Sequence, residues 1–342
     1  MDERILVIGA GAIGSVIAAR LIRHGFGVTV VDANPLQVSA LARPGLWLEA
    51  PDVPGSYVSL RAVERPDQLS GVFDYGLVTV KSPALEEALR PLVAAGRVDT
   101  YVSLGNGLVQ ARIAEIVTPD RLVIGLVEWG ATNLGIGRVR QTTFAPIVIG
   151  ELDNSVSPRL TLLRGVLSCV AKVEIVCDIT ARIWSKLLLN STFSGLGAIS
   201  GLLYGEIVAS ALGRELAFAL WKEGYEVATA AGIRPAPLVD IDPEELLARE
   251  LAQLPRATSA LERLMHRLGA TKASMLQDLE RNTATEVDVI NGGVASTGRR
   301  VARLALLNEG IVSIVHEYED GVGHPAIGAL DRLASMSSSK VR

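Results

Sequence analysis

The stretch RILVIGAGAIG, residues 4–14, decides the fold of the first half of the chain. It begins as an apolar strand over Arg4–Ile8 and continues into three glycines in G-x-G-x-x-G spacing. Apolar residues at helical period follow over 13–24, and a second strand over Val28–Val31 ends in Asp32. Strand, glycine turn, helix, strand and acid, in this order within about 30 residues, predict a Rossmann-type dinucleotide-binding domain.

The glycine turn and the acid also predict the kind of dinucleotide. Glycines let the backbone approach a pyrophosphate, and the helix N-terminus supplies N–H groups and a positive dipole end. A carboxylate at Asp32 can accept hydrogen bonds from both ribose hydroxyls and would repel a 2′-phosphate, and residues 33–35 offer no arginine to receive one. We therefore favour NAD(H) over NADP(H). The residues expected to bind it here are Gly9, Gly11, Ala12, Ile13, Gly14 and Asp32.

Two later strand ends carry polar residues. The strand over Tyr75–Val80 is followed by Lys81, and the strand over Thr100–Leu104 by a Gly-Asn-Gly that contains Asn106. Ligands of an open parallel sheet bind beyond the carboxyl ends of its strands, so Lys81 and Asn106 are expected near the nicotinamide half of the cofactor. A surface lysine in a turn explains Lys81 equally well, and Asn-Gly is itself a favoured turn pair.

The pattern of the chain changes after residue 178. Short alternating strands between 122 and 152 predict an antiparallel extension that closes a first domain over residues 1–178. Beyond it strands vanish, and helical periods recur, among them 243–254 and 287–297.

We therefore expect a second, all-α domain over residues 179–334, with an active site between the two domains. Its apolar helix over 207–231 could supply the surface of a homodimer. The serine-rich residues 335–342 are expected to form a flexible tail.

A polar stripe crosses the most apolar stretch of the second domain, ARIWSKLLLNSTFSGLGAISG at 181–201. On one regular helix, Lys186, Asn190 and Ser194 lie within about 80° of each other. A buried amide or hydroxyl without a partner costs about 1–3 kcal/mol, so this face must meet protein, water or ligand. It suits a small polar substrate, while an ordinary core helix with a lysine at its wet end is the alternative. A membrane span is disfavoured, because Asn and Ser are unfavourable in lipid.

A second segment, KASMLQDLERNTATEVDVINGG at 272–293, carries further polar residues. Ser274 precedes a helix, and Glu286 begins another one twelve residues later. Taken alone, Ser274 is explained as a helix cap and Glu286 as a first-turn carboxylate favoured by the helix dipole.

Together these motifs resemble the ketopantoate reductase family, the 2-dehydropantoate 2-reductases of pantothenate biosynthesis. The resemblance spans residues 4–293 in the expected order and implies a Rossmann domain joined to a helical domain of the 6-phosphogluconate dehydrogenase type. The motifs that carry it are ILVIGAGAIG at 5–14, GNG at 105–107, W-S-K-x-x-x-N at 184–190, S-M-L-Q-D at 274–278 and T-E-V-D-x-I-N-G at 285–292.

The resemblance implies a role for each polar residue. Lys186 would be the catalytic lysine, Glu286 its acidic partner, and Asn106, Asn190 and Ser274 ligand contacts. Hydride addition to a 2-oxo carbon leaves an alkoxide-like oxygen, which a cation beside it can stabilise and protonate. The expected reaction is the reduction of a branched 2-oxo acid, 2-dehydropantoate, to the (R)-2-hydroxy acid, (R)-pantoate.

Two positions depart from the family pattern. The family commonly has a second asparagine followed by proline eight residues after the lysine, where this chain has Ser194 and Gly195. It usually carries a basic residue for NADPH just after the second strand, where this chain has Asp32. Both changes suit an NAD-dependent D-2-hydroxyacid dehydrogenase for other branched or aromatic 2-oxo acids. A non-catalytic NAD-binding sensor is a third hypothesis, although it would not need the lysine, amide, serine and glutamate together.

Composition disfavours other classes of function. The net charge is −4 and the only basic cluster lies at 299–303, so a nucleic-acid partner is not expected. Cys169 and Cys177 lack metal-ligand spacing, and no metal is expected. The chain shows neither a leader with a cleavage site nor a convincing membrane stretch, which favours a cytoplasmic protein without a membrane partner.

Overall fold

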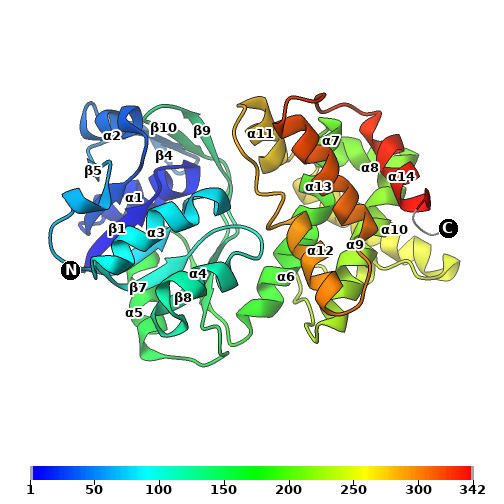
Figure 1. The fold of residues 1–342 in the computed structure, drawn as a ribbon, viewed down its shortest axis with the longest axis horizontal. Coiled ribbons are helices and arrows are strands. Elements are labelled where there is room, and N and C mark those ends of the chain that lie inside the picture. Colours follow the sequence, from blue (N-terminus) through cyan, green and yellow to red (C-terminus); the bar gives the residue numbers. More distant parts are fainter. Residues whose placement is uncertain (1–2, 340–342) are drawn as a thin grey trace. The chain divides into compact units, whose positions relative to one another are not determined.

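The computed structural model describes residues 3–339 and divides into two compact units. The first unit comprises the chain up to Gly105 together with Val109–Ile179, and the second comprises Asn106–Leu108 and the chain from Thr180 onward. In Figure 1 the first unit carries the blue to green part of the chain and most of the second carries green to red. The expected domain boundary at residue 178 lies beside the division after Ile179.

An eight-stranded sheet organises the first unit, in the order β12-β11-β8-β7-β6-β1-β2-β5. From β5 through β8 all neighbours are parallel, whereas β11 is antiparallel to β8. Residues 5–8 at its centre are at most 1% exposed, as expected for a parallel sheet covered on both faces. The strands are β1 (Arg4–Ile8), β2 (Gly27–Val31), β5 (Arg61–Val63), β6 (Phe73–Val78), β7 (Val98–Ser103), β8 (Leu122–Val127), β11 (Ile147–Gly150) and β12 (Val173–Ile175).

The helices of this unit begin at local sequence signals. In α2, Pro35 is the first residue and the Asn34 side chain accepts hydrogen bonds from the N–H groups of Leu36 and Gln37. Buried apolar side chains from α1, α2, α5 and the strands form one hydrophobic core. The helices are α1 (Ala12–Arg23), α2 (Pro35–Ala42), α3 (Leu85–Ala94), α4 (Gln110–Val117) and α5 (Pro158–Leu167), with 3₁₀ turns at Pro66–Gln68, Ser82–Ala84 and Pro119–Arg121.

A separate four-stranded sheet corrects the expected extension over 122–152. Within 122–152, β8 and β11 belong to the main sheet, where β11 is antiparallel to β8, while β9 and β10 join two strands from earlier in the chain in the order β4-β3-β10-β9. The guanidinium of Arg20 on α1 donates to Gln141 and Asp52 of this second sheet region. Its strands are β3 (Leu46–Ala50), β4 (Val53–Val58), β9 (Ala131–Gly135) and β10 (Arg138–Gln141).

The second unit is helical, and after Ile179 the described residues contain no strand. Within residues 3–339 no helix is long and apolar enough to cross a membrane. The bounds are α6 (Ile179–Leu189), a π-helical turn (Asn190–Ser194), α7 (Gly195–Ser200), α8 (Tyr204–Ala209), α9 (Ala211–Ala230), α10 (Leu254–Leu268), α11 (Ser274–Glu280), α12 (Asn291–Arg300), α13 (Leu306–Glu319) and α14 (Ala329–Ser339).

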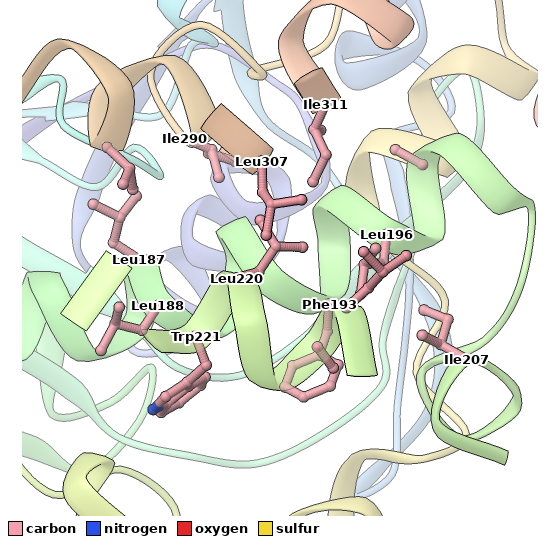
Figure 2. Close-up of a cluster of buried hydrophobic side chains, with 14 of the residues drawn as sticks. Leu187, Leu188, Phe193, Leu196, Ile207, Leu220, Trp221, Ile290, Leu307 and Ile311 are labelled. Carbon is pink, nitrogen blue, oxygen red and sulfur yellow. The ribbon is translucent and has the colours of Figure 1, made fainter. Parts of the chain in front are cut away.

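One hydrophobic core unites these helices. Figure 2 shows Leu188 and Phe193 from the chain around the π turn close to Leu220 and Trp221 of α9, with Leu307 of α13. Helices α7 and α8 have only six residues each, and helices this short are not stable in isolation, so packing rather than propensity stabilises them.

Two expectations about this unit differ from the structure. Instead of one helix over 243–254, the chain forms 3₁₀ turns at Pro243–Leu246 and Leu251–Gln253, and α10 begins at Leu254. Side chains of α9 hold the first turn: Trp221 Nε1 donates to the Pro243 carbonyl at 2.9 Å. The flexible tail expected over 335–342 also differs, since α14 extends to Ser339. Residues 340–342 of that expected tail lie outside the described residues.

Candidate functional site

The glycine turn after β1 is possible only with glycine at two of its positions. Gly9 has φ +101°, and a Cβ on it would lie 2.7 Å from Val80 Cγ1. A Cβ on Gly14 would lie 2.1 Å from the Gly9 carbonyl oxygen. Both glycines therefore allow close packing of the turn, α1 and the end of β6, as the Rossmann turn requires.

The middle glycine faces open space instead. A Cβ on Gly11 would meet no atom of the described residues within 4 Å. Gly11 is also the N-cap of α1, and no side chain in residues 3–339 caps that helix end. The N–H groups of the first turn, which includes Ala12 and Ile13, are left for a ligand, and this arrangement fits the pyrophosphate of a dinucleotide.

Asp32 lies at the same edge of the sheet, at the end of β2. Its Oδ2 accepts a hydrogen bond from Ala10 N at 2.6 Å, inside the glycine turn, and its Oδ1 accepts from Asn34 N at 2.9 Å. Lys81 is exposed just beyond β6, the strand beside β1. The strand order reverses between β1 and β6, so the predicted cofactor residues of this unit gather at the topological switch point.

Asn106 belongs to the other unit, where it meets Glu286. Its Nδ2 donates to Glu286 Oε2 at 3.3 Å, and Glu286 is only 7% exposed. The backbones also join, because Leu108 N donates to Val289 O at 2.8 Å. Gly107 has φ +71°, and a Cβ on it would lie 2.4 Å from Val289 O, so this contact requires glycine. Two motifs about 180 residues apart are thus brought together.

The local setting of Glu286 and Ser274 corrects the sequence interpretation. Glu286 does not begin a helix: it lies in a turn, and α12 begins later, at Asn291. The carbonyl of Val289 bonds to Leu108 N, which removes it from a helical ladder. Ser274 is not the helix cap, since Ala273 occupies the N-cap of α11 and Ser274 is its exposed first residue.

The segment that carries Lys186 is not one regular helix. Lys186 lies in α6, and Asn190 begins the π turn, where the Gly195 N–H donates to the carbonyls of Asn190 and Thr192. Residues after Asn190 are therefore rotated away from the stripe that 100° per residue predicted. Lys186 and Asn190 are both half-buried.

Ser194 consequently leaves the predicted substrate-facing stripe. It is 2% exposed, and its hydroxyl shares a 2.6 Å hydrogen bond with the phenol of Tyr204. Burial raises the pKa of Tyr204 to about 12, so the phenol stays neutral near pH 7. This partner inside the protein accounts for Ser194 and leaves its predicted substrate contact unsupported.

Other elements converge on the π turn. Helix α11, with Ser274 at its start, packs against the π turn and α7. Sequence reasoning missed Asn291 of α12, which is fully buried and donates from Nδ2 to the Ser191 carbonyl at 2.8 Å. It also missed Asn308 and Glu223, which continue the same chain of hydrogen bonds. For Asn291 the available signal was a polar residue that interrupts an apolar helical period after Ile290, whereas Asn308 and Glu223 have charged neighbours, Glu309 and Lys222, and gave no such signal.

A Rossmann unit and an all-helical unit with a lysine, amides and a buried carboxylate define the class of two-domain oxidoreductases. Two models of one family, "Ketopantoate reductase PanE/ApbA" and its C-terminal part, match residues 5–154 and 178–319. The chain belongs to the ketopantoate reductase family.

Relatives cover nearly the whole chain. A 2-dehydropantoate 2-reductase of Archaeoglobus fulgidus is 28% identical over 94% of this chain and 99% of its own. A solved structure of D-mandelate dehydrogenase with NADH and anilino(oxo)acetate is 22% identical, with TM-score 0.80 over 93% of this chain and 99% of that chain. A PanE/ApbA family ketopantoate reductase from Ralstonia eutropha is 23% identical, with TM-score 0.79 over 94% and 100%. These two structures share the fold.

Proposed function

We propose that the chain reduces a branched 2-oxo acid to its (R)-2-hydroxy acid with a pyridine nucleotide, with 2-dehydropantoate as the first candidate substrate. The observation that carries the proposal is the contact of Asn106 with the buried Glu286, in the unit that also contains Lys186 and Asn190. A surface turn or an ordinary core helix would not need an amide paired with a carboxylate in this position. Membership of the ketopantoate reductase family supports the same reaction.

The first unit would hold the nucleotide. Gly11 and the first turn of α1 would receive the pyrophosphate, and Asp32 would accept hydrogen bonds from the ribose hydroxyls. When bound, a reduced nicotinamide supplies the hydride that reduces C2 of the substrate. The negative charge of Asp32 disfavours a 2′-phosphate, which supports NADH over NADPH. The NADH in the D-mandelate dehydrogenase structure is consistent with this choice.

The second unit would supply the proton. As the new C–H bond forms at C2, the π electrons of the carbonyl move to its oxygen. The Lys186 ammonium would stabilise that charge and donate its proton to the oxygen, which becomes the hydroxyl group. Asn190 and Ser274 would bind the substrate carboxylate, and Glu286 would orient Asn106 through their hydrogen bond.

The bond between Ser194 and Tyr204 favours a second candidate. Because the Ser194 hydroxyl is already paired inside the protein, it is poorly placed to recognise a hydroxyl on the substrate. An NAD-dependent D-2-hydroxyacid dehydrogenase, acting on other branched or aromatic 2-oxo acids, would not need that recognition. The two candidates share the roles of Lys186, Asn190 and Glu286 and differ in the substrate side chain.

A steady-state assay with NADH and a panel of 2-oxo acids, including ketopantoate, tests the proposal. Lys186→Ala should lower kcat by about 10²–10⁴-fold, the usual contribution of a general acid. NADH binding, measured by fluorescence titration, should be retained. Lys222→Ala on α9 is the matched control, because its side chain is 43% exposed and should not affect turnover.

The outcomes separate the hypotheses. Turnover of ketopantoate supports the first candidate, and turnover of other 2-oxo acids alone supports the second. NADH binding without reduction of any 2-oxo acid would instead indicate the sensor, and equal kcat in Lys186→Ala and the native chain would remove the lysine from the chemistry.

A further inference from the structure

The π turn leaves one buried carbonyl without its usual helical donor. In a continuous α-helix the Gly195 N–H would donate to the carbonyl of Ser191, four residues earlier. Here the Gly195 N–H donates to Asn190 and Thr192 instead. Ser191 is fully buried, so its carbonyl needs another donor from within the protein.

The side chain of Asn291 supplies that donor. Its Nδ2 lies 2.8 Å from the Ser191 carbonyl oxygen and 2.9 Å from Asn308 Oδ1. Both neighbours are acceptors, so the amide nitrogen must face them. Gly195 makes room for the amide, because a Cβ there would lie 3.0 Å from Asn291 Nδ2. The motif residue Asn291 thus replaces a missing backbone donor.

A buried carboxylate fixes the orientation of the second asparagine. Asn308 donates to Glu223 Oε1 from both its side-chain Nδ2, at 2.8 Å, and its backbone N, at 2.9 Å. Leu307 N donates to Glu223 Oε2 at 3.1 Å. Glu223 comes from α9, so a chain of hydrogen bonds links α9 through α13 and α12 to the π turn, with Asn291 donating toward both ends.

Buried hydrophobic side chains before, within and after the π turn fix the rotation of the two helix segments that the turn joins. Leu187 and Leu188 precede it, Phe193 lies within it and Leu196 follows it, and all four are buried in the same core (Figure 2). Without the extra residue that a π turn accommodates, the two helix segments would be rotated by about 100° relative to each other. The orientation of Lys186 and Asn190 would change with them.

We propose that Asn291 is a positioning residue that holds the π turn and thereby orients Lys186 and Asn190. The part of this inference that concerns catalysis rests on the proposed function. Asn291 acts through the Ser191 carbonyl, and Asn308 and Glu223 fix its amide.

Asn291→Asp tests the proposal, because it keeps the size of the side chain and replaces the donor by an acceptor. An oxygen would then face the Ser191 carbonyl and Asn308 Oδ1. We expect faster amide hydrogen exchange in residues 190–195, measured by mass spectrometry. With the 2-oxo acid that the native chain reduces, kcat should fall about 100-fold, the effect of a misplaced catalytic group. The KM for NADH should stay within about twofold, because the residues proposed to hold the pyrophosphate and the ribose lie in the other unit.

Ile314→Val is the control for a general loss of stability. Ile314 is fully buried in the same core and takes no part in the polar chain. It should leave kcat and the exchange of 190–195 unchanged. Asn308→Ala removes the side chain that accepts from Asn291 Nδ2, and it should give the same changes in kcat and exchange, but smaller ones. This second variant provides the test if Asn291→Asp does not fold.

The inference would be overturned if Asn291→Asp showed native exchange rates and native kcat. If Asn291→Asp does not fold, the same result in a folded Asn308→Ala would overturn it. If the native chain reduces no 2-oxo acid, the proposed function fails, and the exchange of residues 190–195 still decides whether Asn291 holds the π turn.

Discussion

Asp32 is the single residue whose chemistry bears most directly on the nucleotide. In Asp32→Asn the single side-chain oxygen can still accept from Ala10 N, which keeps the glycine turn in place, while the negative charge and the hydrogen bond from Asn34 N are lost. A charge pair near a protein surface contributes about 1–4 kcal/mol, so the ratio of kcat/KM for NADH to that for NADPH should fall about tenfold. Steady-state kinetics with both nucleotides measures this ratio.

The control for this change is Asp99→Asn. Asp99 is exposed and lies near the first residue of β7, whereas Asp32 follows the last residue of β2. It removes the same charge away from the glycine turn and should leave the ratio unaltered. An unaltered ratio in Asp32→Asn would mean that the carboxylate serves only to hold the Ala10 amide.

Ser194 illustrates what a single residue can and cannot reveal from sequence. Its spacing of eight residues from Lys186 was recognisable, and so was the departure from the family asparagine. Its partner was not, because Tyr204 meets it only through the fold of α7 and α8. Asn106 and Glu286 were both predicted as site residues, but their contact depends on the chain pairing of Leu108 with Val289.

At the scale of elements, the buried carboxylate of Glu223 on α9 accepts hydrogen bonds from the N-terminal N–H groups of α13. Burial raises the pKa of Glu223 above its ordinary value, with partial compensation from its hydrogen bonds to Asn308 and Leu307. The folded chain therefore binds this proton more tightly than the unfolded chain does. The contribution of protonated Glu223 to the free energy of unfolding is fully present below the ordinary glutamate pKa of about 4.3. It is lost as pH rises through the raised pKa of Glu223 in the folded chain.

Urea unfolding at pH values from about 4 to about 8 measures this effect in native protein and in Glu223→Gln. The native free energy of unfolding minus that of Glu223→Gln should decrease as pH rises above about 4.3. Glu317→Gln is the control of opposite sign, because the Arg332 guanidinium lowers the pKa of Glu317. The native free energy of unfolding minus that of Glu317→Gln should decrease as pH falls. A pH-independent difference for Glu223→Gln would contradict the raised pKa.

Elements with local signals were predictable, and those fixed by distant contacts were not. The glycine turn, α1 and Asp32 follow from adjacent residues. The pairing of β3 with β10 joins segments about 90 residues apart, and the strand β4 is mostly exposed with little apolar alternation. The π turn escaped detection because a period of 100° per residue assumes an α-helix, whereas Asn291 from a distant segment supplies the compensating hydrogen bond.

For the whole molecule, the two units have separate hydrophobic cores, although the chain passes between units after Gly105, Leu108 and Ile179. Leu220 belongs to the helical core and is fully buried. Leu220→Ala should lower the free energy of unfolding of the helical unit by about 2–5 kcal/mol. Because the cores are distinct, hydrogen exchange should accelerate in the helical unit and stay native in the Rossmann unit.

The reciprocal change completes this prediction. Leu77 is equally buried in the core of the Rossmann unit, and Leu77→Ala should accelerate exchange there and leave α9, α12 and α13 protected. Peptide-resolved mass spectrometry distinguishes the two patterns. Acceleration of both units by either variant would instead mean that they unfold cooperatively. In that case the passage of Asn106–Leu108 into the helical unit would be the natural cause, because unfolding either unit would then release the Asn106–Glu286 contact.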